Sequence, residues 1–138
     1  MKLKIYSDGG ARGNPGPAAI GVVVCDEKDE IVFEHADAIG EATNNTAEYC
    51  ALVAGLELAK RFGAKTVECF TDSELIMNQL AGNYKIKADH IRILHARAKK
   101  LAETFDSITY HHRRREFPLL KKADQLVNQV LDGKWEGK

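Results

Sequence analysis

Four carboxylates in this 138-residue chain lie where separate structural elements are expected to begin or end. Asp8 follows a strand-like alternation at the start of the chain, and Asp72 follows a short apolar segment. If those two strands are parallel neighbours, both acids lie at their carboxyl ends, where sites in such sheets form. Glu48 falls in the first turn of a predicted helix, and Asp124 falls early in the last one. Clustered carboxylates repel one another unless a cation neutralises them, and such sites suit Mg²⁺ or Mn²⁺ better than zinc.

Each acid also has an ordinary structural explanation. Asp8 begins an Asp-Gly pair that is common in turns, and Asp72 is a typical N-cap. Asn45 and Glu48 have the spacing of a capping box, and Asp124 lies beside lysines as a surface acid would. Taken one at a time, these explanations are preferred, so the case for a shared site depends on the residues around the acids.

The elements that must position these acids follow from hydrophobic periodicity. Strands are predicted over residues 2–7, 18–25, 31–39, 66–70 and 107–111, with a turn-rich loop at 8–17. Helices are predicted over residues 44–62, 73–80, 89–104 and 121–131, with caps at Asn44 or Asn45 and at Thr71 or Asp72. The order βββαβααβα predicts an α/β fold, a mixed sheet with helices on both faces.

Length and composition predict one soluble domain over residues 1–138. No apolar run approaches the length of a membrane span, and the first residues lack the apolar core of a signal peptide. Cys25, Cys50 and Cys69 have no C-x-x-C spacing, which argues against a disulfide scaffold and a zinc site. We therefore expect a cytoplasmic protein, and whether any cysteines pair is left open.

Acidic and basic residues balance at 20 each but are unevenly placed. Residues 26–41 hold seven acids and one lysine, whereas residues 113–122 hold five bases and one glutamate. The basic run is compatible with an anionic partner, but a solvated charged face is the simpler explanation at this point.

The segments around the four acids resemble the motifs of type 1 ribonuclease H. In chain order these segments are YSDGGARGNPG (6–16), TNNTAE (43–48), TDS (71–73) and ADQLVN (123–128). The resemblance spans almost the whole chain and is closest to the compact archaeal and bacterial variants. It implies the ribonuclease H-like fold, with a five-stranded mixed sheet in the order 3-2-1-4-5. It also implies endonucleolytic hydrolysis of the RNA strand of RNA–DNA hybrids, leaving 3′-hydroxyl and 5′-phosphate ends.

The resemblance also implies roles for individual residues. The residues matching its catalytic, metal-binding positions are Asp8, Glu48, Asp72 and Asp124, which would hold two Mg²⁺ ions, or Mn²⁺ in their place. The residues matching its substrate-binding positions are Gly10, Arg12, Asn14, Thr43, Asn44 and Asn45. His112 matches a mobile histidine that assists proton transfer or product release. The expected partner is an RNA–DNA hybrid, bound by a monomer with no membrane association and no obligate protein partner.

The chain departs from the family pattern in three places. Many members carry a basic handle where this chain has only residues 83–88, so hybrid binding would depend on other bases. Glu74 stands where some members have glutamine. In the last loop, Pro118 replaces an asparagine and two residues are added, which leaves open whether His111 or His112 is the loop histidine.

The sequence also bears on functions other than hydrolysis. A catalytically silent hybrid-binding module would have no need for four mutually repelling acids. A nucleotide-phosphate enzyme would need the Gly-Lys-Ser/Thr ending of a P-loop, which the glycine-rich segment 9–16 lacks. Other nucleases of this fold share the acids but not the glycine-rich segment with the Asn44–Asn45 pair. Cleavage-site preference, the preferred metal and activity on double-stranded RNA stay open.

Overall fold

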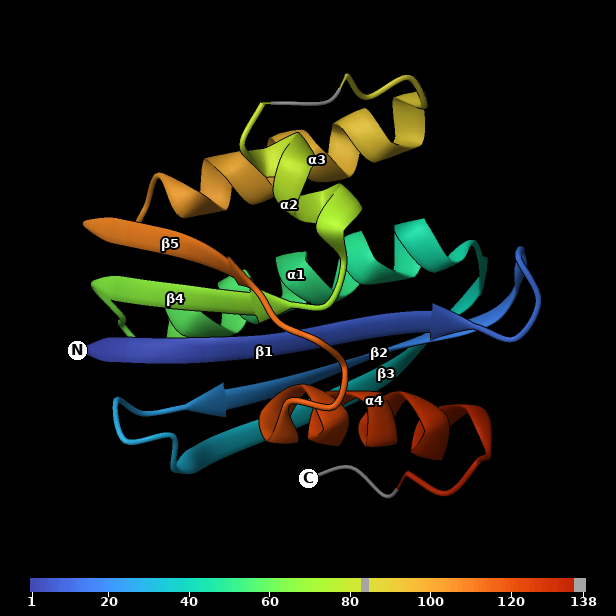
Figure 1. Ribbon diagram of the computed structural model, residues 1–138, viewed down its shortest axis with the longest axis horizontal. Helices are drawn as coiled ribbons and strands as arrows, with labels where there is room; N and C mark the ends of the chain where they lie inside the picture. The colour runs from blue at the N-terminus through green and yellow to red at the C-terminus, as the bar shows by residue number, and fades with distance from the viewer. Residues whose placement is uncertain (83–84, 136–138) are drawn as a thin grey trace.

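A five-stranded mixed sheet organises the computed structural model, which describes residues 1–82 and 85–135 (Figure 1). The strands are β1 (Lys2–Ala11), β2 (Gly16–Cys25), β3 (Ile31–Ala42), β4 (Thr66–Thr71) and β5 (Ser107–His112). They are ordered β3-β2-β1-β4-β5. β2 pairs antiparallel with both β1 and β3, whereas β4 pairs parallel with both β1 and β5. The predicted strand order and mixed sheet are confirmed.

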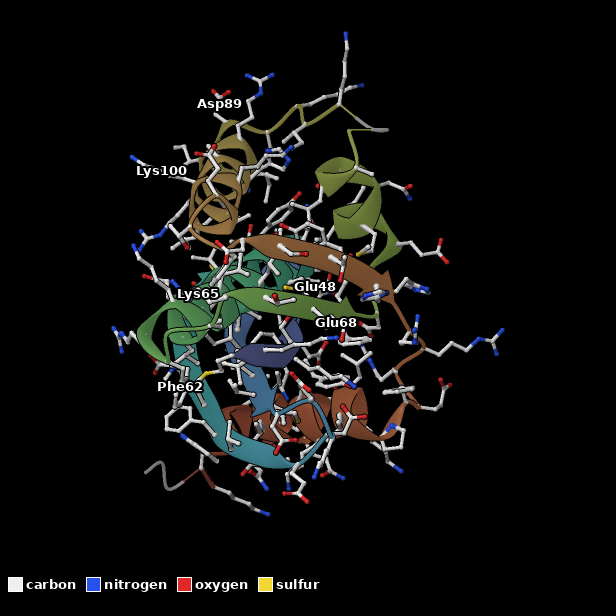
Figure 2. All side chains as sticks on the ribbon, turned by 90° about the vertical axis from the view of Figure 1, so that its left-hand side faces the viewer. Glu48, Phe62, Lys65, Glu68, Asp89 and Lys100 are labelled. Carbon is white, nitrogen blue, oxygen red and sulfur yellow. The ribbon has the colours of Figure 1, made fainter. Side chains whose placement is uncertain are left out.

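Helices cover both faces of the sheet, as Figure 2 shows end-on. They are α1 (Asn44–Arg61), α2 (Glu74–Leu80), α3 (Asp89–Ala102) and α4 (Pro118–Leu131). Because side chains alternate along a strand, Ile5 joins the core beneath α1 and α3, and Tyr6 joins the core beneath α4. Within the described ranges, no helix combines the length and apolar character needed to cross a membrane.

α1 approaches β1 unusually closely because small residues recur every four positions along it. Ala47, Ala51, Gly55 and Ala59 are all buried and lie on one helix face. A Cβ atom on Gly55 would lie 2.5 Å from the Ile5 side chain, so the helix backbone itself contacts the sheet. This close approach places the first turn of α1 directly against the carboxyl half of β1.

β1 is longer than the sequence predicts, and the difference places the first acid. The expected loop at 8–17 instead begins with strand, because Asp8 to Ala11 pair with Gly21 to Ala18 of β2. Pairing with β4 covers only Lys2 to Tyr6, so β1 runs on past the end of its parallel neighbour (Figure 1). Asp8 therefore lies within a strand, at the point where one edge of that strand becomes free.

Three helix starts also differ from prediction. Thr43, rather than either following asparagine, caps α1 by accepting a hydrogen bond from the Thr46 amide at 3.2 Å. Ser73, rather than either preceding residue, caps α2 in the same way. α4 starts at Pro118 instead of residue 121, because proline suits the first helical position, where no amide donor is needed. The added residues of the last loop are thus helical, and Leu120 is fully buried.

The connection between α2 and α3 is as short as predicted. It spans residues 81–88, of which Asn83 and Tyr84 lie outside the described residues. The described part of this connection, residues 81–82 and 85–88, contains no helix.

Gly9 and Gly10 offer a matched test of the contact between β1 and α1. A Cβ atom on Gly9 would lie 2.2 Å from the backbone of Ala47, whereas one on Gly10 would meet only Val127 at 3.6 Å. We expect Gly9→Ala to lower the free energy of unfolding by about 3 kcal/mol, since the helix backbone must move. Gly10→Ala should be neutral or stabilising by about 0.5 kcal/mol. Urea unfolding measures both, and equal losses would contradict the contact.

Candidate active site

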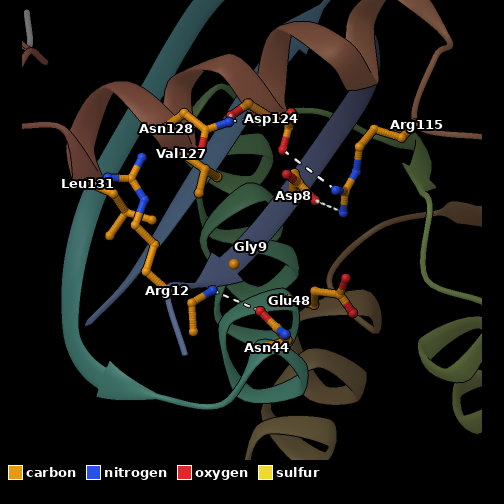
Figure 3. A pocket seen from close by; sticks show the side chains of 12 residues that line it. Asp8, Gly9, Arg12, Asn44, Glu48, Arg115, Asp124, Val127, Asn128 and Leu131 are labelled. Atoms are coloured by element: carbon orange, nitrogen blue, oxygen red, sulfur yellow. Dashed lines mark hydrogen bonds and ion pairs between the residues drawn. The ribbon is translucent and has the colours of Figure 1, made fainter. Parts of the chain in front are cut away.

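Three of the four predicted acids converge at the open end of β1. One carboxylate oxygen each from Asp8, Glu48 and Asp72 lies within 4.8 Å of the others. Asp8 is only 4% exposed and lies within β1, on the same face of the sheet as Tyr6, which α4 covers. Asp72 directly follows β4, and Glu48 reaches the cluster because Gly9 lets α1 approach (Figure 3). The predicted convergence of these three acids is observed.

Asp124 also adjoins the cluster, where its side chain interacts with Asp8 and helps to raise the Asp8 pKa. The Arg115 side chain lies between the acids, with Nε donating to Asp72 Oδ2 at 2.8 Å. Its terminal nitrogens lie 3.9 Å from Asp8 Oδ1 and 4.0 Å from Asp124 Oδ1. The sequence identified the basic run 113–115 as a whole but not the inward position of Arg115, since nothing in three consecutive arginines distinguishes one of them.

Two carboxylate oxygens in this cluster are buried without a hydrogen-bond donor. They are Asp8 Oδ1 and Asp72 Oδ1. Burial, together with the nearby charge of Asp72, raises the pKa of Asp8 to about 8, although Arg115 opposes the shift. Burial likewise raises the pKa of Glu48 to about 7, against a hydrogen bond from Ser73. Such acids are costly to bury as anions unless a cation neutralises them.

The donor set fits a hard divalent cation. All three converging ligands are carboxylate oxygens, which Mg²⁺ and Mn²⁺ prefer, and the two oxygens without donors are free to coordinate. No cysteine or histidine belongs to this group among the described residues, which disfavours zinc. Asp8, Glu48 and Asp72 are therefore the residues that could hold a metal, with Asp124 nearby.

A polar hollow of about 310 Å³ extends from the acids along β1 and α4. Three predicted substrate-binding residues line it: Gly10, Arg12 and Asn44. Arg12 is paired there with Asp132, just past α4, at 2.7 Å. Because the hollow joins the acids to a glycine-rich backbone, an anionic substrate could approach both at once.

Asn44 holds the loop between β1 and β2 against the start of α1. Its side-chain oxygen accepts from the Ala11 amide at 2.8 Å, and its backbone amide donates to Asn14 Oδ1 at 3.0 Å. Thr43 instead uses its hydroxyl to cap α1. Asn45 Oδ1 is buried with no hydrogen-bond partner. Two of the predicted substrate residues, Asn14 and Asn44, thus shape the loop.

The two adjacent histidines lie on opposite faces of β5, as the alternation predicts. The His111 ring stacks on Phe70 with centroids 4.9 Å apart, and its Nε2 lies 3.4 Å from Glu68. His112 Nε2 instead lies 3.9 Å from Glu74 in the first turn of α2. His112 is therefore the histidine beside the element that follows Asp72.

The chain is similar to known proteins over nearly its full length. A family model described as reverse transcriptase-like matches residues 6–130. Ribonuclease HI of Halobacterium salinarum is 42% identical over 95% of this chain and 65% of its own length. The bifunctional protein Rv2228c of Mycobacterium tuberculosis is 41% identical over 96% of this chain and 36% of its own. This chain thus spans less than two thirds of either relative.

Solved structures extend the similarity to the fold. The RNase H domain of Rv2228c superposes with a TM-score of 0.92, at 39% identity, covering 97% of this chain and 96% of that domain. Halobacterium RNase H1 gives 0.92 at 41% identity, covering 96% and 99%. LC11-RNase H1, isolated from compost and solved in complex with an RNA/DNA hybrid, gives 0.88 at 43% identity, covering 95% and 97%.

Asp8→Asn tests the cost of the buried charge. The pKa of Asp8 is raised from 3.8 to about 8 by folding, so between those values the folded state binds more protons than the unfolded state. Its contribution to stability is therefore most favourable near pH 4 and is lost as the pH rises through about 8. In EDTA at pH 8.5 we expect the variant to be more stable than wild type by about 1–3 kcal/mol.

Urea unfolding across a pH series measures this difference. It should shrink toward zero as the pH falls to about 3, below both pKa values, where Asp8 is mostly protonated in both states. Asp37→Asn, at an exposed position of β3, is the control and should show no such pH trend. A gain in stability that stays constant between pH 4 and pH 8.5 would contradict the assignment.

Proposed function

The chain belongs to the type 1 ribonuclease H family, and on that premise we propose that it hydrolyses the RNA strand of RNA–DNA hybrids. The observation that carries this proposal is the cluster of Asp8, Glu48 and Asp72, with two donor-less oxygens, at one end of a polar hollow. The hybrid bound by LC11-RNase H1, which matches 95% of this chain, supports the substrate class.

The acids are proposed to hold two Mg²⁺ ions, or Mn²⁺ in their place. When bound, these ions would supply activation of the attacking water and stabilisation of the leaving 3′-oxygen. Asp8 and Asp72 would coordinate the ions through the oxygens that lack hydrogen-bond donors. Glu48 and Asp124 would supply further carboxylate ligands on either side of them. The proposed products carry 3′-hydroxyl and 5′-phosphate ends.

The hollow offers two means of distinguishing RNA from DNA. Gly10 is partly exposed in the hollow, and its backbone can approach a sugar edge closely because no Cβ intervenes. Glu48 lies in the same hollow as a hydrogen-bond acceptor for a 2′-hydroxyl, the group that distinguishes RNA. Asn44 keeps the glycine-rich backbone in place through its bond to the Ala11 amide.

A binding module without catalysis is the alternative from another functional class. Two features disfavour it: Asp8 is buried beside Asp72, and each has an oxygen without a donor. A protein that only binds an anionic hybrid would gain affinity by losing these charges. Metal-dependent hydrolysis requires the buried acids as ligands, whereas binding alone does not.

Asp72→Asn should abolish Mg²⁺-dependent cleavage of a labelled RNA–DNA hybrid, lowering turnover by at least about 10²–10³-fold through loss of charge stabilisation. Glu68→Gln is a matched control, because Glu68 lies in β4, which Asp72 directly follows, and its side chain contacts Lys2 and His111 rather than the cluster. It should cleave like wild type.

The same cleavage assay also compares nucleic-acid substrates of different kinds. Gel analysis of hybrid, RNA duplex, DNA duplex and single strands, with Mg²⁺ or EDTA, should give cleavage of the hybrid's RNA strand only when Mg²⁺ is present. The RNA duplex arm determines whether that substrate is also cut. Hybrid binding without cleavage by wild type would favour the silent module, and normal turnover by Asp72→Asn would reject the metal assignment.

His112→Ala tests the assisting role of the loop histidine. We expect turnover at saturating hybrid to fall about ten- to a hundredfold, within or below the usual contribution of general acid–base catalysis. His111→Ala should change turnover little, because that ring is packed on Phe70 beside Glu68. A larger loss at His111 would mean that the loop assignment is shifted by one residue.

A further inference from the structure

Arg115 differs from its two neighbours in where its charge lies. Arg113 donates to the His112 carbonyl at 2.8 Å and lies over the Phe70 ring, 5.5 Å from its centroid. Arg115 instead contacts three of the four acids of the candidate site. Of the three consecutive arginines, it is the one whose guanidinium lies where a metal ion would compete for the same oxygens.

The guanidinium neutralises the cluster only partly. A single positive charge is shared among three carboxylates, and only the 2.8 Å contact with Asp72 is within hydrogen-bond distance. Asp8 Oδ1 and Asp72 Oδ1 remain without donors despite its presence. The planar guanidinium carries a single charge and donates to neither of these two oxygens. A compact ion with two charges could coordinate both of them.

The Arg115 side chain can leave the acids without a rearrangement of its loop. The turn is fixed on both sides, since the Arg113 amide donates to the Thr71 carbonyl at 3.0 Å and the Phe117 amide donates to the Arg114 carbonyl at 3.0 Å. Phe117 also stacks on Tyr6 in the core beneath α4, with centroids 6.0 Å apart. The Arg115 side chain itself is 56% exposed, so ion pairing alone holds it inward, and exposed ion pairs are weak.

We propose that Arg115 is an internal counter-cation that occupies the Asp8–Asp72–Asp124 side of the site before metal binds and must be displaced from these acids by a divalent ion. This inference rests on the proposed function, because it requires that the acids bind such an ion. Its consequence is that Arg115 stabilises the metal-free protein and weakens metal binding at the same time.

The test measures metal affinity directly rather than activity. Mn²⁺ is titrated into EDTA-stripped, dialysed protein at pH 8, with isothermal calorimetry for heat and electron paramagnetic resonance for free Mn²⁺. The proteins are wild type, Arg115→Gln, Arg115→Lys and the control Arg114→Gln. The control removes the same charge from the same turn but from a side chain that makes none of the carboxylate contacts.

Arg115→Gln should bind Mn²⁺ about tenfold more tightly than wild type, because the ion no longer competes with a bound cation. Its thermal midpoint in EDTA should be lower than that of wild type, and saturating Mn²⁺ should close the gap. Arg114→Gln should match wild type in both measurements. A purely structural role for Arg115 would lower the midpoint without tightening Mn²⁺ binding, so unchanged or weaker binding overturns the proposal.

Arg115→Lys keeps the experiment decisive if the glutamine variant does not fold. Lysine retains the charge but loses the planar fork that spans several carboxylates, so it should bind Mn²⁺ about threefold more tightly than wild type. Affinity equal to wild type would again overturn the proposal. If wild type neither binds Mn²⁺ nor cleaves hybrid, the proposed function fails; if it does both while Arg115→Gln binds no tighter, only this inference fails.

Discussion

Negative charge gathered at one end of the sheet is the constraint on which the rest of this structure depends. Asp8 and Asp72 come from parallel neighbours, and Glu48 comes from a helix that must approach the sheet closely to join them. The small residues of α1 permit that approach, and Gly9 permits it at the site itself. The backbone therefore fixes the spacing of the acids, and neutralising them is left to Arg115 or to a bound cation.

The glycine-rich segment serves this arrangement in two ways. As strand, it pairs with β2 and places Asp8 at the free edge left by β4. As the floor of the hollow, it leaves backbone accessible beside the acids. Asn44 couples both roles, because it belongs to the first turn of α1 and holds the Ala11 amide at the end of β1. The substrate-binding and metal-binding parts of the proposed site are thus joined through one helix terminus.

Much of the fold and of the candidate site could be predicted from the sequence. Each feature that could not be predicted has a physical cause. The hydrophobic periodicities of strands and helices predict the order of the elements. The four acids stand out because they lie at the predicted ends of those elements. The continuation of β1 through Gly9 was missed because an Asp-Gly-Gly segment locally favours a turn, whereas pairing with β2 is non-local. The inward position of Arg115 was missed because it depends on how Phe117 anchors the turn, which is a matter of tertiary packing.

Three of the four acids lie in β1, α1 and α4 and the fourth directly follows β4, so their positions extend from residue 8 to residue 124. The site therefore exists only when nearly the whole chain is in place, since partial assemblies lack at least one of the acids. An ion held by residues this distant along the chain would bind the native state and not the unfolded chain, and would shift the global folding equilibrium by mass action. Under the proposed metal binding, the concentration of divalent ions would therefore help to set the fraction of this chain that is folded.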